Sequence, residues 1–95
     1  VEEIVRLTSF GSAQIFGLVG KGKIEIGADA DFVVVDLEKE TRVENGDLWT
    51  KCNWSPFDGM KLKGVVVQTF LRGIEAFDGE NICVKQGSGK NVNWE

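Results

Sequence analysis

Two runs of β-branched and aromatic residues most constrain how this chain can fold. Phe32–Val35 is an uninterrupted apolar run between Asp31 and Asp36, and Gly64–Leu71 is a longer segment rich in β-branched and aromatic residues. Residues of this kind favour strands, and an unbroken apolar run is typical of a strand buried on both faces. We therefore expect both segments to be strands and the first to be covered on both sides.

Shorter alternating segments and turn dipeptides surround these two runs. Alternation predicts strands at Lys23–Ile26 and Thr41–Glu44, and Ile74–Phe77 is expected to return along Gly64–Leu71 after a turn at Arg72–Gly73. Other signals predict turns at Asn45–Gly46 and Asp78–Gly79, a helical turn at Asp47–Lys51, and an extended polar tail over Lys85–Glu95. We expect about five or six short strands in all.

The first segment, Glu2–Leu18, is expected to be helical. Ser9 is predicted to cap a second short helix over Ser12–Phe16, and Gly17 is predicted to end it. These helices are too short to be stable without a partner surface. Their apolar stripe is therefore expected to be a core or docking face, formed by Ile4, Val5 and Leu7.

Size and composition then limit the fold class. The 95 residues are 42% hydrophobic and 27% charged, which is ordinary for a soluble globular chain. An eight-stranded α/β barrel needs roughly 250 residues, so this chain cannot close one. We expect an α+β, mostly β unit, and because several strands would be edges, we expect those edges to be covered by something else.

Several classes of function are excluded by composition. The chain has no histidine, which rules out a histidine-based zinc site, a Ser–His or Cys–His pair and a histidine base within it. The net charge of −4 argues against nucleic acid and anionic membranes as partners, and no apolar run reaches the roughly 18 residues of a membrane span. Cys52 and Cys83 are expected to be two free thiols of a cytoplasmic protein.

Two groups of residues are candidates for ligand binding. Asp29, Asp31 and Asp36 resemble a carboxylate metal site, but the glycine and distal glutamate of a calcium loop do not follow, so strand ends are the favoured interpretation. Gly87–Gly89 resembles the start of a phosphate loop, but a poor helix follows it, and Gly20–Lys23 lacks the phosphate-loop pattern. A solvated tail and a turn are favoured for these two segments.

One loop carries an unusual number of aromatic residues. Trp54 and Phe57 flank Pro56, and they could form a ligand platform. Because no polar cluster surrounds them in sequence, packing under the domain or against a partner is favoured, as it is for Trp49 and Trp94. No nucleophile with a base is identifiable, so the residues indicate a non-catalytic module.

Several stretches resemble signatures of cyclic amidohydrolases. Thr8–Leu18 (TSFGSAQIFGL) is similar to the T-x-x-P-A-x-x-F-G-L stretch that closes the barrel of these enzymes. Lys21–Asp36 (KGKIEIGADADFVVVD) is similar to their K-G-x-I-x-x-G-x-D-A-D-L-V-x-x-D signature. Two departures occur, since Gly11–Ser12 stands where the family commonly has Asn-Pro, and Gln14 stands where a basic residue is usual. Loss of that proline is expected to loosen the second helix.

A narrower resemblance points to the dihydroorotases. Lys51–Gly64 (KCNWSPFDGMKLKG) is similar to their K-x-x-[ST]-P-F-x-G-x-x-[LV]-x-G stretch, and Val65–Gly79 is similar to the hairpin that follows it. The resemblance implies that residues 1–19 are the last helices of a metal-dependent (β/α)8 barrel. It implies that residues 20–95 are the C-terminal part of a composite β-sandwich.

The same resemblance places the chemistry outside this chain. In dihydroorotases, the barrel carries histidines, a carboxylated lysine and a catalytic aspartate, and zinc activates a hydroxide that attacks the ring amide of dihydroorotate. No catalytic, cofactor-binding or metal residue is expected here. The chain is expected to be an inactive C-terminal fragment whose partners are the barrel and N-terminal strands of the parent enzyme, which would hold the zinc and the small-molecule substrate.

Two alternatives remain open at this point. The parent could be a sister enzyme, an allantoinase or a hydantoinase, although the Ser55–Phe57 loop and the Arg72–Gly73 hairpin favour a dihydroorotase. The chain could also be a stand-alone, non-catalytic interaction module derived from the family.

Overall fold

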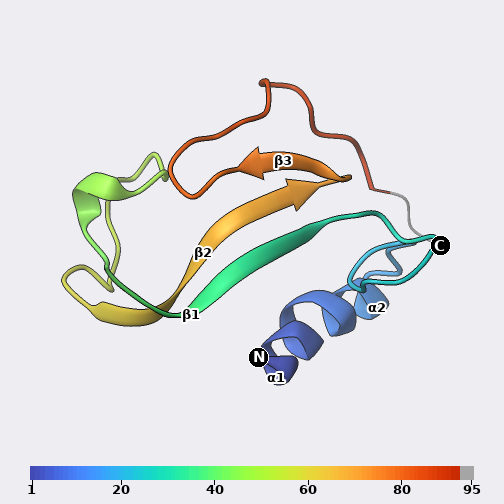
Figure 1. Ribbon diagram of the computed structural model, residues 1–95, viewed down its shortest axis with the longest axis horizontal. Coiled ribbons are helices and arrows are strands. Elements are labelled where there is room, and N and C mark those ends of the chain that lie inside the picture. Colours follow the sequence, from blue (N-terminus) through green and yellow to red (C-terminus); the bar gives the residue numbers. More distant parts are fainter. Residues whose placement is uncertain (93–95) are drawn as a thin grey trace.

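The computed structural model describes residues 1–92, which form a helical segment and a sheet. The helical segment comprises α1 (Glu2–Val5), η1 (Arg6–Phe10) and α2 (Gly11–Ile15), and the strands are β1 (Phe32–Arg42), β2 (Lys61–Leu71) and β3 (Ile74–Phe77). The strands form one antiparallel sheet in the order β1-β2-β3, and the helical segment lies beyond the β1 edge (Figure 1). The prediction of a small, mostly β chain with a helical start is confirmed.

The helical segment is continuous, which corrects the predicted break and second N-cap. The backbone stays right-handed through Arg6 (φ −58°, ψ −44°) and Gly11 (φ −63°, ψ −40°), and Ser9 caps no helix. The middle turn winds as a π-helix, in which the Gly11 N–H donates to the Arg6 carbonyl. A Cβ at position 11 would lie 2.6 Å from that carbonyl oxygen, so glycine permits the turn to close. Gly17, at φ 61°, follows the helix end as predicted.

The strongest predicted strand is confirmed as β2, which begins three positions earlier than expected, at Lys61. It pairs with β3 through the predicted turn, where Arg72 (φ 50°) and Gly73 (φ 76°) both have positive φ, as a tight hairpin requires. On the other side it pairs with β1, and the Phe32 and Phe70 rings stack there with centroids 4.7 Å apart. Two register shifts interrupt the β1–β2 ladder.

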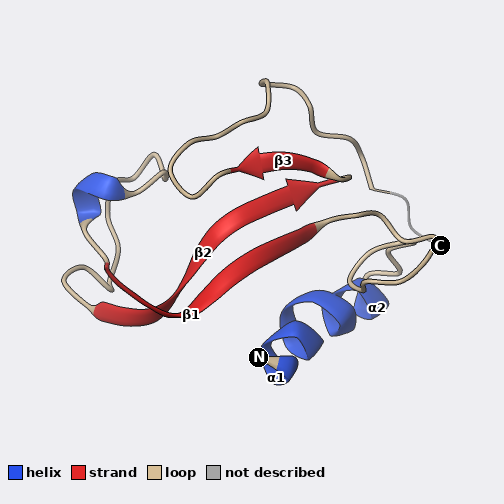
Figure 2. Ribbon diagram, in the orientation of Figure 1, coloured by secondary structure: helices blue, strands red, loops and turns tan. Residues whose placement is uncertain are grey.

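Three local predictions are wrong. Lys23–Ile26 is not a strand but part of the long loop between α2 and β1 (Figure 2), because no neighbouring strand among residues 1–92 offers it hydrogen bonds. The predicted turn at Asp47–Lys51 lies earlier, as the 3-10 turn η2 (Asn45–Asp47). The described chain contains three strands rather than five or six.

The expectation that Phe32–Val35 is covered on both faces is also wrong within these residues. Val33, Val34 and Val35 are 55%, 38% and 41% exposed, because the sheet is a single layer with neither face packed on a second one. Of the residues that the structure describes, only Ala13 is buried. In the same part of the chain, no helix is both long and apolar enough to cross a bilayer.

Candidate functional site

Charged side chains from distant segments meet at one end of the sheet. The Asp31 carboxylate accepts a hydrogen bond from the Lys21 ammonium at Oδ2. Its Oδ1 accepts a hydrogen bond of 2.7 Å from the backbone N–H of Arg72. Lys21 Nζ also lies 2.7 Å from Asp29 Oδ2. We refer to Lys21, Asp29, Asp31 and Arg72 as the clamp, because they join the loop before β1 to the hairpin turn between β2 and β3.

The clamp is partly shielded from water. The side chains of Lys21 and Asp31 are 18% and 27% exposed, so their attraction is less screened than at an open surface. Hydrogen bonds to Asp29 and Asp31 raise the pKa of Lys21. Burial by itself would raise the pKa of Asp31, but the Lys21 hydrogen bond and the Arg72 N–H outweigh it and lower that pKa. Both groups are therefore held in their charged forms.

Backbone hydrogen bonds reinforce the same junction. The Gly73 N–H donates to the Ala30 carbonyl at 2.9 Å, beside the clamp. The Arg72 guanidinium donates to the Ser88 carbonyl at 2.7 Å, which ties in the segment after β3. Three regions that are far apart in sequence are thus held together at one point, and this arrangement suits positioning rather than catalysis.

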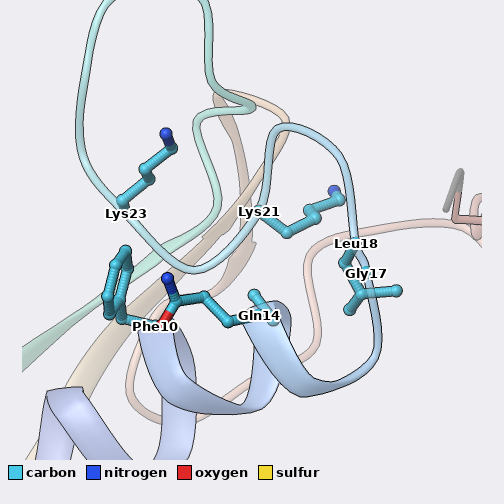
Figure 3. Close-up of a pocket in the computed structure, with 7 residues that line it drawn as sticks. Phe10, Gln14, Gly17, Leu18, Lys21 and Lys23 are labelled. Atoms are coloured by element: carbon cyan, nitrogen blue, oxygen red, sulfur yellow. The ribbon is translucent and has the colours of Figure 1, made fainter. Parts of the chain in front are cut away.

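A pocket of about 310 Å³ lies between the helical segment and the loop that carries the clamp. Figure 3 shows Phe10 and Gln14 rising from the helix, with Lys21 and Lys23 extending from the loop that passes over it. Lys21 is engaged in the clamp, and Lys23 Nζ lies 2.5 Å from Glu25 Oε1. Both ammonium groups are therefore neutralised by carboxylates of this chain, which makes the pocket a weak anion site.

The three aspartates considered for metal binding do not converge. Asp29 and Asp31 face Lys21, whereas the Asp36 carboxylate accepts the backbone N–H groups of Glu38 and Lys39 at 2.9 and 3.1 Å. No group of three or more His, Cys, Asp or Glu side chains suited to a metal ion occurs in the described part of the chain. The prediction that both residues mark strand ends is right for Asp31, which directly precedes β1, and wrong for Asp36, which lies inside β1 because the strand continues to Arg42. It also missed the role of Asp31 in the clamp.

The two glycine-rich segments that were considered as phosphate loops lie in a turn and a loop that hold the fold together. Gly87 and Ser88 lie in a turn after β3, where the Ser88 carbonyl receives Arg72, and residues 89–92 form no helix. Gly20–Lys23 is a loop segment that contributes Lys21 to the clamp. Neither segment leads into a helix N-terminus, which a phosphate loop needs.

The aromatic loop is held in place but its rings are open to solvent. Trp54 and Phe57 are 64% and 57% exposed. Asn45 anchors the loop, since its Oδ1 accepts the Ser55 N–H at 2.9 Å and its own N–H donates to Asp58 Oδ1 at 2.8 Å. This exposure contradicts packing under the domain within residues 1–92, and contact with a partner stays a prediction. Trp49 is 74% exposed, and Trp94 lies outside the described residues.

The two cysteines are free and exposed. Hydrogen bonds with Thr50 and the backbone of Trp54 lower the pKa of Cys52. Desolvation and the neighbouring Asp78 carboxylate raise the pKa of Cys83. Cys52 is therefore the more readily ionised thiol of the two.

The predicted helical stripe is an exposed apolar surface. Ile4, Val5 and Leu7 are 64%, 47% and 56% exposed, and Phe16 is 70% exposed. A core position within residues 1–92 is therefore excluded for this stripe, and a docking face stays a prediction.

The clamp was missed by the sequence reasoning, although a signal was present. Lys21, Asp29 and Asp31 are opposite charges in a short glycine-rich stretch, which is compatible with a closed loop. What no local pattern indicates is the partner of Asp31 on the hairpin, because Arg72 lies 41 positions away and contributes its backbone N–H.

Known proteins are similar to this chain in both sequence and fold. The model of the Amidohydrolase family matches residues 1–89. A dihydroorotase from Pyrococcus horikoshii is 41% identical over 87% of this chain and 20% of its own length, and an allantoinase from Solibacter usitatus is 37% identical over 92% and 19%. The solved structure of an L-hydantoinase from Arthrobacter aurescens matches with a TM-score of 0.93 at 33% identity, over 97% of this chain and 21% of that chain. The chain thus spans about a fifth of the length of these relatives.

Proposed function

This chain belongs to the amidohydrolase family, and from that premise we propose that it is the non-catalytic, C-terminal part of a dihydroorotase-type cyclic amidohydrolase. The observation that carries the proposal is the 41% identity to a dihydroorotase over a stretch that makes up 20% of that enzyme. Residues 1–19 would be the last helices of the barrel, and residues 20–95 would belong to the β-sandwich beside it. The exposed helical stripe and the uncovered sheet support this assignment, since each offers an apolar face to a larger body.

The reaction that we propose for the whole enzyme is the reversible cyclisation of N-carbamoyl-L-aspartate to dihydroorotate, a step of pyrimidine biosynthesis in the cytoplasm. A zinc ion would supply hydroxide chemistry for such a reaction. The residues of this chain do not fit a zinc site, because it has no histidine and because the three candidate aspartates, Asp29, Asp31 and Asp36, are engaged by Lys21 or by backbone N–H groups. We therefore assign no step of the reaction to this chain, whose role is to support and cover the catalytic part.

A hydantoin-hydrolysing parent is the second candidate. It is supported by the fold comparison, in which an L-hydantoinase has a TM-score of 0.93 with 33% identity. The allantoinase similarity, at 37% identity, belongs to the same group of ring-opening amidohydrolases. All these parents require the same scaffold from this chain and differ in the substrate held by the catalytic part.

Segment replacement tests the proposal directly. The matching segment of the Pyrococcus horikoshii dihydroorotase would be exchanged for this chain, and the same exchange would be made in the Arthrobacter aurescens L-hydantoinase. We expect the dihydroorotase chimera to retain turnover of dihydroorotate and to exceed the hydantoinase chimera in fraction of parental activity retained. The reverse order would favour a hydantoin-hydrolysing parent.

This chain alone, supplied with zinc, should not turn over dihydroorotate, and measurable hydrolysis by it would contradict the proposal. Folded but inactive chimeras of both kinds would favour a stand-alone interaction module.

A further inference from the structure

The helical segment and the sheet are separated by a pocket of about 330 Å³, which Val5 and Ser9 line from the helical side and Phe32 and Val33 line from β1. Within residues 1–92, no Cα atom of α1, η1 or α2 comes within 8 Å of a Cα atom in a strand. The connection is made by the loop over residues 16–31, which leaves the helix at one end and enters β1 at the other (Figure 1). The relative orientation of the two bodies therefore depends on how this loop is held.

The loop packs closely on the helical segment at Gly22. A Cβ placed there would lie 2.7 Å from both the Ala13 Cβ and the Ser9 carbonyl oxygen. Ala13, at 6% exposed, is the only buried residue among those that the structure describes. The loop also closes on itself, because the Asp29 N–H donates to the Gly20 carbonyl at 2.9 Å. The loop and the helix end thus form one packed unit.

The other side of this unit is attached to the sheet by the clamp. Lys21 lies next to Gly22 in the chain and reaches Asp31, whose other carboxylate oxygen holds the Arg72 N–H at 2.7 Å. The adjacent bond from Gly73 to Ala30 is 2.9 Å long, and the Arg72 guanidinium reaches Ser88. The Asp31 carboxylate therefore links the loop unit, which carries the helical segment, to the hairpin turn.

We propose that the clamp is an orientation latch, in which the Lys21–Asp31 ion pair sets the angle of the helical segment relative to the sheet. With the pair intact, the loop unit is held against the hairpin turn in one arrangement. Without it, the helical segment swings on the loop while the sheet keeps its own ladder. This inference goes beyond the proposed function and does not depend on which ring the parent opens.

A distance measurement between the two bodies tests the latch in the full 95-residue chain. Spin labels would be placed on the helix with Ile15→Cys, whose side chain is 81% exposed, and on β1 with Glu40→Cys, after Cys52→Ser and Cys83→Ser. Asp31→Asn keeps an oxygen for the Arg72 N–H but removes the charge, and Lys21→Met removes the other partner. We expect each variant to broaden the label distance distribution by roughly twofold, as a second arrangement becomes populated.

The control is Glu38→Gln, which removes the exposed Lys63–Glu38 pair within the sheet. It should leave the label distance distribution the same as in the labelled chain without this substitution. Amide exchange in β1 and β2 should stay unchanged in all three variants. The latch is overturned if Asp31→Asn and Lys21→Met leave the distribution unchanged. It is equally overturned if sheet exchange rises with the broadening, since Asp31 would then stabilise the whole fold, or if the control broadens the distribution as much.

Discussion

Two lysine–carboxylate pairs in this chain share their chemistry and differ in their surroundings. Lys21 and Asp31 meet at the junction of the loop with the hairpin turn, where they are 18% and 27% exposed. Lys63 and Glu38 face each other across β1 and β2 at 2.6 Å, with 57% and 85% of their side chains exposed. Exposed pairs are screened by water and cost side-chain entropy to order, so they contribute little. The comparison teaches that distance alone does not identify the pair on which the architecture depends.

The largest effect is expected where the loop unit packs on the helix. Gly22→Ala places a Cβ 2.7 Å from Ala13 and from the Ser9 carbonyl, at a residue with φ 81°. Overpacking and left-handed strain together should lower the free energy of unfolding by about 2–3 kcal/mol, read from the urea midpoint by circular dichroism. Gly27→Ala is the matched control, because Gly27 has a φ of 91° and its Cβ would meet nothing within 4 Å. Equal losses in the two variants would show that the close contact at Gly22 is not present in solution.

The next effect tests the clamp itself. Asp31→Ala removes the partner of Lys21 and leaves the Arg72 N–H without its acceptor. We expect a loss of about 1–3 kcal/mol in urea unfolding, with a smaller loss for Asp31→Asn, which retains an acceptor oxygen. A double-mutant cycle with Lys21→Met should show that the two losses are not additive. Strict additivity would mean that the two side chains do not interact.

The pH dependence should follow from the same two groups. The pKa of Asp31 is lowered in the fold, so its contribution is present above the unfolded value of about 3.9 and is lost as the pH falls through the folded pKa. The pKa of Lys21 is raised, so its contribution is present below about 10.4 and is lost as the pH rises through the folded pKa. The loss in free energy of unfolding at either pH extreme should be smaller than the loss caused by Asp31→Ala. Titration removes a charge, whereas the substitution removes the whole carboxyl group.

Urea midpoints measured against pH would check this expectation, with Asp29 and Arg72 as the neighbouring charged groups in every sample. Subtracting the Asp31→Asn profile from that of the parent chain should leave a difference that vanishes at the acid end. A difference that persists unchanged through the acid limb would contradict the lowered pKa of Asp31.

The smallest effect is expected at the exposed pair. Glu38→Gln should change the free energy of unfolding by no more than about 0.5 kcal/mol, and added salt should abolish even that change. The Asp31 variants should respond less to salt, because their site is partly shielded. If Glu38→Gln lowered the free energy of unfolding as much as Asp31→Asn does, the expected difference in stabilisation between the two ion pairs would be contradicted.

The elements differ in how far they could be predicted. The β2–β3 hairpin was predicted closely, because a long β-branched run, the Arg72–Gly73 turn and a short alternating segment are all local signals. Lys23–Ile26 has the same alternation, yet it forms no strand, since a strand exists only when a neighbour takes its hydrogen bonds. The π-turn before Gly11 was missed because a glycine there reads equally well as a helix break.

For the candidate site, sequence alone indicated the apolar helical stripe and the family, but not the clamp. Ile4, Val5 and Leu7 were recognised from helical spacing, and the structure places them at the surface. The role of Asp31 was missed because half of its hydrogen bonding goes to a backbone N–H, and every residue type except proline carries that group. No pattern in the sequence can single out such a partner.

The sequence by itself determined the local features of this protein: its strands at β1 and β2, its hairpin turn, the end of its helix, and its membership of the amidohydrolase family. These follow from side-chain shape and backbone preference over a few neighbouring residues, or from signatures written in consecutive positions. Only the tertiary structure decided that the helical segment stands apart from the sheet and that Asp31 joins them. The physical reason is that a contact between residues far apart in the chain depends on the path of everything between them.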